Sequence, residues 1–138
     1  MRQKNNCIFC KIVRDDAPAI KIHEDEHTLA FMDINPASEG HTLVVSKEHF
    51  ENILDIDAPA LTAVSLATQR LAGAIYRALE PDGLRISQFN GGAAGQTVFH
   101  YHAHLIPIRR GQHAESHGRG PGNLERIKEI AQKISATL

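Results

Sequence analysis

The chain has 138 residues, with 15 basic against 16 acidic side chains and a formal net charge of −1. No long basic run is available to follow a phosphate backbone, which weighs against nucleic-acid binding, and no apolar run approaches the ~18 residues of a membrane span. We therefore expect one domain over residues 1–138, located in the cytoplasm and independent of membranes.

Alternating apolar residues between turn residues predict five short strands. They span residues 20–22, 28–34, 41–46, 84–90 and 98–108. Short turns join them, so mostly antiparallel pairing is expected.

Two amphipathic helices are predicted as well. Asp57 and Pro59 mark the start of a long helix, and residues 81–83 (Pro-Asp-Gly) mark its end. Its periodic positions are Leu61, Val64, Thr68, Leu71, Ile75 and Leu79. The second helix is capped by Asn123 and has Leu124, Ile127, Ala131 and Ile134 on one side. The expected class is α+β, with the long helix covering one sheet face.

Cys7 and Cys10 are the only cysteines and form a Cys-x-x-Cys pair. In a reducing compartment such a pair binds a metal or does redox work more often than it forms a structural disulfide. No thioredoxin-like βαβ unit follows it, which weighs against a redox role. Two ligands alone do not close a zinc site, so two small buried side chains are the plain alternative.

Three histidines in the last predicted strand are spaced by two residues. Side chains alternate on a strand, so His100, His102 and His104 share one face. The residues between and beside them, Phe99, Tyr101, Ala103 and Leu105, are expected to face a core. A neutral imidazole can attack, accept a proton or bind a metal near pH 7, so the pattern indicates a site of chemistry.

A glycine-rich loop over residues 91–97 precedes this strand. Glycines such as Gly95 allow backbone N–H groups to approach an oxyanion closely, although a Gly-Gly pair is also an ordinary turn. Asn90, Gln96 and Thr97 add uncharged donors for phosphoryl oxygens. The loop therefore suits phosphate when it stands beside the three histidines.

Residues 99–106 (FHYHAHLI) resemble the His-x-His-x-His motif of the histidine triad (HIT) family. The resemblance extends to the segments Gly95-Gln96-Thr97-Val98, Phe31-Met32-Asp33-Ile34 with Pro36, and Gly40-His41-Thr42-Leu43-Val44-Val45 before Lys47. It covers about residues 7–108 and leaves 109–138 as a variable C-terminal segment. The chain has no tryptophan, and residues 109–122 do not look like the C-terminal segment of the Hint-like phosphoramidases.

The resemblance implies a HIT fold, with a sheet of about five antiparallel strands, and a two-fold homodimer. It also implies hydrolysis or transfer at the α-phosphate of a purine nucleoside phosphoramidate or dinucleoside polyphosphate. By position His102 is the nucleophile that becomes nucleotidylated, with His104 and His41 assisting at the phosphoryl oxygens or the leaving group. Asn90, Gly95, Gln96 and Thr97 would contact the phosphate. Asp33 would bind the ribose, and Phe31 and Ile34 would flank the base.

Zinc-containing members of the family further imply a structural metal. Their ligand positions correspond here to Cys7, Cys10, His49 and His100, which would make a closed tetrahedral site with two thiolates and two imidazoles. No catalytic metal is expected. His23, His27, His113 and His117 are left as surface residues.

Two other functions compete with this interpretation. A metallohydrolase could bind a catalytic zinc through the triplet or His41, because His-x-His on a strand is also a metal-ligand geometry. The amide and hydroxyl side chains near the triplet, without an obvious carboxylate base, favour phosphoryl chemistry instead. A non-catalytic nucleotide sensor would keep the pocket and act through partners, but a complete triad argues against lost catalysis.

Overall fold

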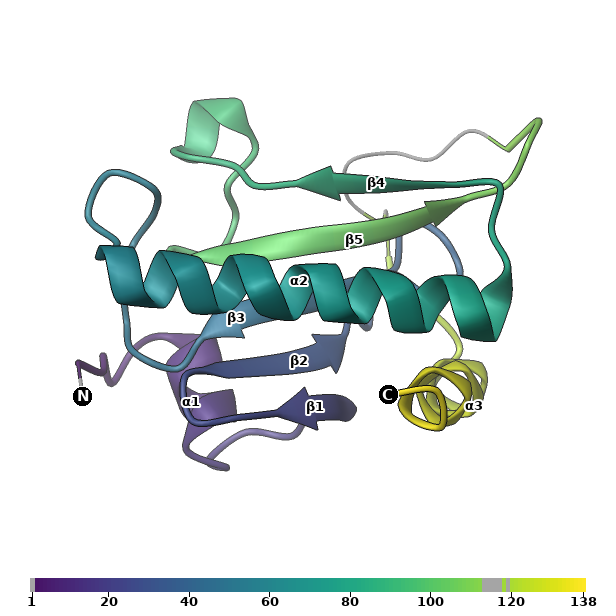
Figure 1. The fold of residues 1–138 in the computed structure, drawn as a ribbon. Coiled ribbons are helices and arrows are strands. Elements are labelled where there is room, and N and C mark those ends of the chain that lie inside the picture. The colour runs from purple at the N-terminus through teal and green to yellow at the C-terminus, as the bar shows by residue number, and fades with distance from the viewer. Residues whose placement is uncertain (1, 113–117, 119) are drawn as a thin grey trace.

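The computed structural model describes residues 2–112, 118 and 120–138, and it contains a five-stranded antiparallel sheet (Figure 1). The strand order is β1-β2-β3-β5-β4. The strands are β1 (Lys21–Glu24), β2 (Thr28–Met32), β3 (Thr42–Ser46), β4 (Gly83–Ser87) and β5 (His102–Ile108). The predicted sheet and its antiparallel pairing are confirmed.

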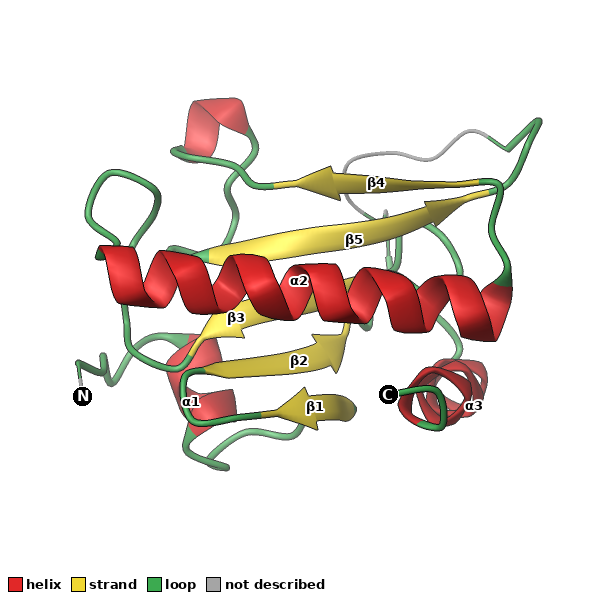
Figure 2. Cartoon of the chain, in the orientation of Figure 1, coloured by secondary structure: helices red, strands yellow, loops and turns green. Residues whose placement is uncertain are grey.

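The central strands β2 and β3 are buried at every position, so both faces of the sheet are covered. Helix α2 (Ala58–Leu79) crosses one face, and the short helix α1 (Ile8–Val13) packs on the other (Figure 2). Side chains of β3 alternate between them: Val44 belongs to the α2 core, while Leu43 and Val45 face α1. The two faces therefore have separate cores.

The register of β5 against β3 decides which face the histidines take. His102 pairs with Val45 and His104 pairs with Leu43, so both imidazoles point to the α1 side. Ala103 pairs with Val44 and faces α2. His102 and His104 thus lie on the face of the sheet that the long helix leaves uncovered.

Helix α2 begins and ends as predicted. The Asp57 carboxylate accepts a hydrogen bond from the backbone N–H of Ala60, and Glu80 ends the helix in a left-handed conformation with φ 49°. Val64, Leu71 and Ile75 are buried against the sheet. The helix therefore supplies the larger of the two cores, as its apolar period indicated.

Helix α3 (Leu124–Ser135) begins after Asn123, whose side chain accepts from the N–H of Arg126. It packs against α2 and β1. Ile127, Ala131 and Ile134 are buried as expected, together with Ile130. Leu124 shares this side by its spacing of seven residues from Ala131, but as a first-turn side chain it is half exposed.

Three of the predicted strands are longer than the strands in the structure. β2 ends at Met32, β4 ends at Ser87, and β5 begins only at His102. Phe99 was expected in the core but is half exposed, because it precedes the regular strand and strand alternation does not apply to it. Helix α1 was not predicted, because its six residues are too few to show a helical period.

Of the four histidines expected at the surface, His27 is exposed, and the side chain of His23 is only 18% exposed. His113 and His117 lie outside the described residues. None of the helices in the described ranges is long and apolar enough to cross a bilayer.

Gly40 offers a test of how tightly the β2–β3 connection packs. Its φ is +94°, and a Cβ added there would lie 2.6 Å from Leu79 Cδ1. Gly40→Ala should therefore lower the free energy of unfolding by about 2 kcal/mol or more, from backbone strain and overpacking together. Gly83→Ala is the matched control, since Gly83 has open space around it and no positive φ. Equal urea midpoints for both variants would contradict this account.

Candidate active site and metal centre

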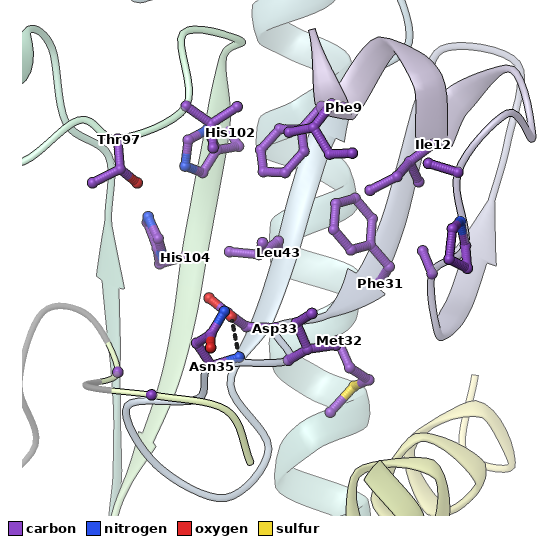
Figure 3. Close-up of a pocket in the computed structure, with 18 residues that line it drawn as sticks. Phe9, Ile12, Phe31, Met32, Asp33, Asn35, Leu43, Thr97, His102 and His104 are labelled. Carbon is purple, nitrogen blue, oxygen red and sulfur yellow. Dashed lines mark hydrogen bonds between the residues drawn. The ribbon is translucent and has the colours of Figure 1, made fainter. Parts of the chain in front are cut away.

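His102 stands at the first position of β5, on the face that α1 partly covers. Its Nδ1–H donates to the backbone carbonyl of His100 over 2.6 Å, which places the lone pair of the neutral ring on Nε2. The ring lines a cavity of about 600 Å³ (Figure 3). His102 is thus held in the tautomer that a nucleophile needs.

His104 receives its tautomer through a chain of hydrogen bonds. The N–H of Ala37 donates to His41 Nδ1 over 2.9 Å, so the proton of a neutral His41 lies on Nε2. That N–H points at His104 Nδ1, 3.0 Å away. His104 consequently carries its own proton on Nε2. Its ring centroid lies 4.9 Å from that of His102, so a donor and a lone pair stand side by side.

Asp33 follows β2 directly and lines the same cavity. One carboxylate oxygen accepts from the N–H of Asn35 over 2.8 Å, and the other lies 3.6 Å from His41 Nε2. The carboxylate is therefore held close to His41 and His104, and Figure 3 shows Asp33 and His104 in the same cavity.

Asp33, His41 and His104 have donor atoms close enough to raise the question of a catalytic metal. The hydrogen bonds argue against one. His41 Nδ1 is occupied by the N–H of Ala37, so Nε2 must keep its proton in a neutral ring and has no lone pair for a cation. His104 Nδ1 accepts that same proton. Asp33 alone would be too few ligands for zinc.

Asn90 and Gln96, predicted as phosphate contacts, make hydrogen bonds within the protein. The Gln96 carboxamide accepts from the N–H of Gly91 and donates to the carbonyls of Glu51 and Val98. Asn90 accepts from the N–H of Ile53 and exchanges hydrogen bonds with Gln88. Both amides therefore brace this loop in the described structure.

Two other predicted phosphate contacts lie in the same loop. Thr97 lines the cavity. Gly95 adopts φ +106° and closes a short 3₁₀ turn, η1 (Gly92–Ala94), through its N–H to Gly92. A glycine is needed here because side chains rarely adopt this conformation.

An apolar wall completes the cavity. Phe31 and Ile34, predicted beside a base, are both among its lining residues. Ile8, Phe9 and Ile12 of α1 line it too, and the sequence analysis missed them. Phe9 meets His102 edge-on, with ring centroids 5.0 Å apart. The signal that could have found Phe9 is its position between Cys7 and Cys10. A metal site shared with His49 and His100 would bring this segment onto the sheet.

Phe89 was also missed. Its ring centroid lies 5.3 Å from that of His104, so an aromatic side chain packs against the proposed donor. It lies beyond the end of β4, where strand alternation gives no guide to direction.

Four predicted metal ligands converge behind His102. Cys7 caps the N-terminus of α1, and its Sγ lies 3.4 Å from His100 Nδ1. Cys10 Sγ lies 3.3 Å from His49 Nδ1, and the two histidine Nδ1 atoms are 3.2 Å apart. His100 presents Nδ1 because its Nε2–H donates to the carbonyl of Ser46. The structure thus brings together all four residues from three distant segments.

The donor set and its spacing fit a tetrahedral zinc ion. Bonds of about 2.3 Å to sulfur and 2.0 Å to nitrogen imply nitrogen–nitrogen and sulfur–nitrogen edges of about 3.3–3.6 Å. Burial lowers the pKa of His49, and it lowers that of His100 to about 4, so both rings are neutral ligands at pH 7. Burial raises the pKa of the Cys10 thiol and so disfavours the thiolate. A bound cation would stabilise the thiolate and offset this effect.

Residues 14–111 match the HIT domain model, and the chain belongs to the HIT family. It is 47% identical to Protein hit of Bacillus subtilis over 107 residues, 78% of this chain and 74% of that protein. It is also 36% identical to Adenylylsulfatase HINT3 of Arabidopsis thaliana, over 75% of this chain and 53% of the relative.

Solved structures agree with the fold over nearly the whole chain. A Hit-like protein from Bartonella henselae, described as involved in cell-cycle regulation and holding an unknown ligand, superimposes with a TM-score of 0.92 at 39% identity and covers 100% of both chains. A Zn-bound histidine triad family protein from Mycobacterium smegmatis gives 0.85 at 38% identity, covering 96% of this chain and 92% of that one.

The hydrogen-bond chain predicts four tautomers that nuclear magnetic resonance can read. At a pH where these four imidazole rings are uncharged, long-range proton–nitrogen spectra should show His102 protonated on Nδ1. His41, His100 and His104 should be protonated on Nε2. The exposed His27 provides a reference signal from outside the site. A His102 proton on Nε2 would contradict the assignment of its lone pair.

Proposed function

We propose that this protein hydrolyses or transfers the nucleotidyl group of a purine nucleoside phosphoramidate or dinucleoside polyphosphate, acting at the α-phosphate through a nucleotidyl-histidine on His102. The observation that carries the proposal is the pairing of a lone pair on His102 Nε2 with a proton on His104 Nε2 at one cavity wall. A nucleophile and an acid are thereby present together on neighbouring side chains.

In the first step, His102 Nε2 forms a bond to the α-phosphorus while the bond to the leaving group breaks. The leaving atom takes the proton from His104 Nε2, and the proton between His41 and His104 moves to His104 Nδ1, so the negative charge passes to His41 and is balanced by the positive charge of the nucleotidylated His102 ring. In the second step water attacks the same phosphorus, the phosphorus–nitrogen bond breaks, and the proton of water returns to the histidine pair. The product is a nucleoside monophosphate.

Binding of the nucleoside follows from the rest of the cavity. Phe9, Phe31 and Ile34 offer an apolar slot for a flat base, and Asp33 can accept from ribose hydroxyls at its edge. Thr97 and the backbone N–H groups of the glycine loop would hold phosphoryl oxygens. Asn90 and Gln96 would act on substrate only by exchanging the loop contacts that they make in the described structure.

Charge within the cavity favours a phosphoramidate among the possible substrates. Among the described residues that line it there is one carboxylate, Asp33, and no lysine or arginine. A polyphosphate chain would carry several negative charges into this setting, where no described lining residue offers a lysine or arginine partner. A phosphoramidate needs only one phosphoryl group and releases an amine, which the His104 proton would serve.

A structural zinc ion on Cys7, Cys10, His49 and His100 belongs to the same proposal. It is supported by the ligand distances and by the Zn-bound relative. The ion would tie the N-terminal segment to the start of β5, next to His102.

We also propose that the protein works in the cytoplasm as a homodimer. Strand β4 is an edge of the sheet, with one side unpaired among the described residues and Ile86 half exposed on it. Such an edge can pair with that of a second copy. Sedimentation of the purified protein would measure this directly.

Removing the nucleophile should abolish turnover. His102→Ala should lower kcat for release of adenosine monophosphate from an adenosine phosphoramidate by at least about a thousand-fold, because no other group can form the covalent intermediate. His27→Ala is the matched control, since it removes an exposed histidine from the surface. Equal rates in the two variants, both folded by circular dichroism, would exclude His102 as the nucleophile.

The metal proposal has a readout that does not depend on activity. The purified protein should contain about one zinc per chain, and a strong chelator should lower its Tm by about 10 °C or more, because the site ties three segments together. Cys10→Ser should bind less zinc and lose most of the chelator response. A wild-type Tm that a chelator leaves unchanged would contradict a structural metal.

A further inference from the structure

The connection between β2 and β3, residues 33–41, carries much of the proposed site. It holds Asp33 and Ile34 at the cavity, and its Ala37 N–H sets the tautomer of His41. We call it the nucleoside loop. Its position therefore decides both where a nucleoside would lie and which way the His41–His104 chain is protonated.

The C-terminal segment holds this loop at two points. The N–H of Gly122 donates to the Ile34 carbonyl over 2.8 Å. Four residues later, Arg126 makes a two-pronged ion pair with Glu39, with nitrogen–oxygen distances of 3.0 and 2.9 Å. The hydrogen bond from Arg126 is also the main reason that the pKa of the Glu39 carboxyl is lowered.

Gly122 also touches the nucleoside loop through its backbone. A Cβ at this position would lie 2.9 Å from Pro36 Cδ, so the absence of a side chain lets the two segments meet closely. A neighbouring cavity of about 230 Å³ is lined by both the loop and α3. Because packing is incomplete there, the discrete contacts at Ile34 and Glu39 matter more for the loop's position.

Helix α3 is firmly anchored behind these contacts. Ile130 and Ile134 are buried against the sheet and α2, and Arg77 of α2 donates two hydrogen bonds to the carbonyl of Thr137. The helix lies outside the residues matched by the HIT domain model, which end at 111. Because α3 is anchored by these contacts, its Arg126 can hold the nucleoside loop in a fixed position.

We propose that the C-terminal helix positions the nucleoside loop, with Arg126 acting through Glu39 as a positioning residue for nucleotide binding. Arg126 is not among the residues that line the cavity of His102 and His104; it lines the smaller cavity, which His41 also borders. The inference rests on the proposed function, since it assigns the effect to nucleoside affinity and not to the chemical step.

The test compares Arg126→Ala with Lys128→Ala. Lys128 lies on the same helix and makes an exposed ion pair with Glu125, away from the loop. Arg126→Ala should raise KM for the adenosine phosphoramidate, and Kd for adenosine monophosphate, by about two- to five-fold, the range of an exposed ion pair. Its kcat should stay within about two-fold. Lys128→Ala should leave all three values as in the wild type.

Amide exchange supplies a measurement that does not depend on catalysis. Backbone amides of residues 33–41 should exchange faster in Arg126→Ala than in Lys128→Ala. In the double variant with Glu39→Gln, the effects of the two substitutions should be less than additive, because each removes the same contact.

The outcomes separate the two proposals. Equal loop exchange in Arg126→Ala and Lys128→Ala would overturn the positioning role, whether or not nucleotide is hydrolysed. Faster exchange with unchanged KM and Kd would overturn it as well. If the wild type neither binds adenosine monophosphate nor cleaves the phosphoramidate, the proposed function itself fails.

Discussion

The hydrogen bond from His102 to the carbonyl of His100 is the contact on which the rest of the site depends. It fixes one imidazole tautomer, and it does so through a residue whose own side chain is held by Ser46 and faces the two cysteines. A backbone carbonyl cannot rotate away as a side chain can, so the lone pair of His102 has a stable direction. The candidate metal ligand His100 and the candidate nucleophile His102 are thus two residues apart and joined by a hydrogen bond, so a displacement of one would displace the other.

A second series of contacts starts from the opposite kind of backbone group. The N–H of Ala37 sets His41, and His41 sets His104, so that an amide donor ends as a donor at the cavity. One ring is therefore presented as an acceptor and its neighbour as a donor, although their side chains are chemically identical. The difference comes from the partners that the backbone supplies and not from charged residues. This arrangement keeps the cavity nearly free of fixed charge among the described residues, which suits a substrate that brings its own.

The strand periodicity was sufficient to place His102 and His104 on one face, and the family motif was sufficient to select Cys7, Cys10, His49 and His100, whose donor atoms the structure brings together. The contribution of α1 could not be predicted, because a six-residue helix has no period and its place is decided by contacts across the sheet. The interpretation of Asn90 and Gln96 was limited for a related reason. Both are polar residues in a glycine loop, and sequence does not say whether such an amide faces a ligand or Glu51 and Ile53 of another loop. Nonlocal partners decided these cases.

Helix α1 carries two kinds of residue within two turns: Cys7 at its cap and Cys10 face the metal centre, while Ile8 and Ile12 line the cavity. A helix this short has little stability of its own, so its order comes from what it packs against. Any opening of the N-terminal segment would therefore take one wall of the cavity with it. A ligand resting on this wall adds its binding free energy to the closing of the segment. A variant that destabilises the N-terminal segment would therefore also weaken ligand binding.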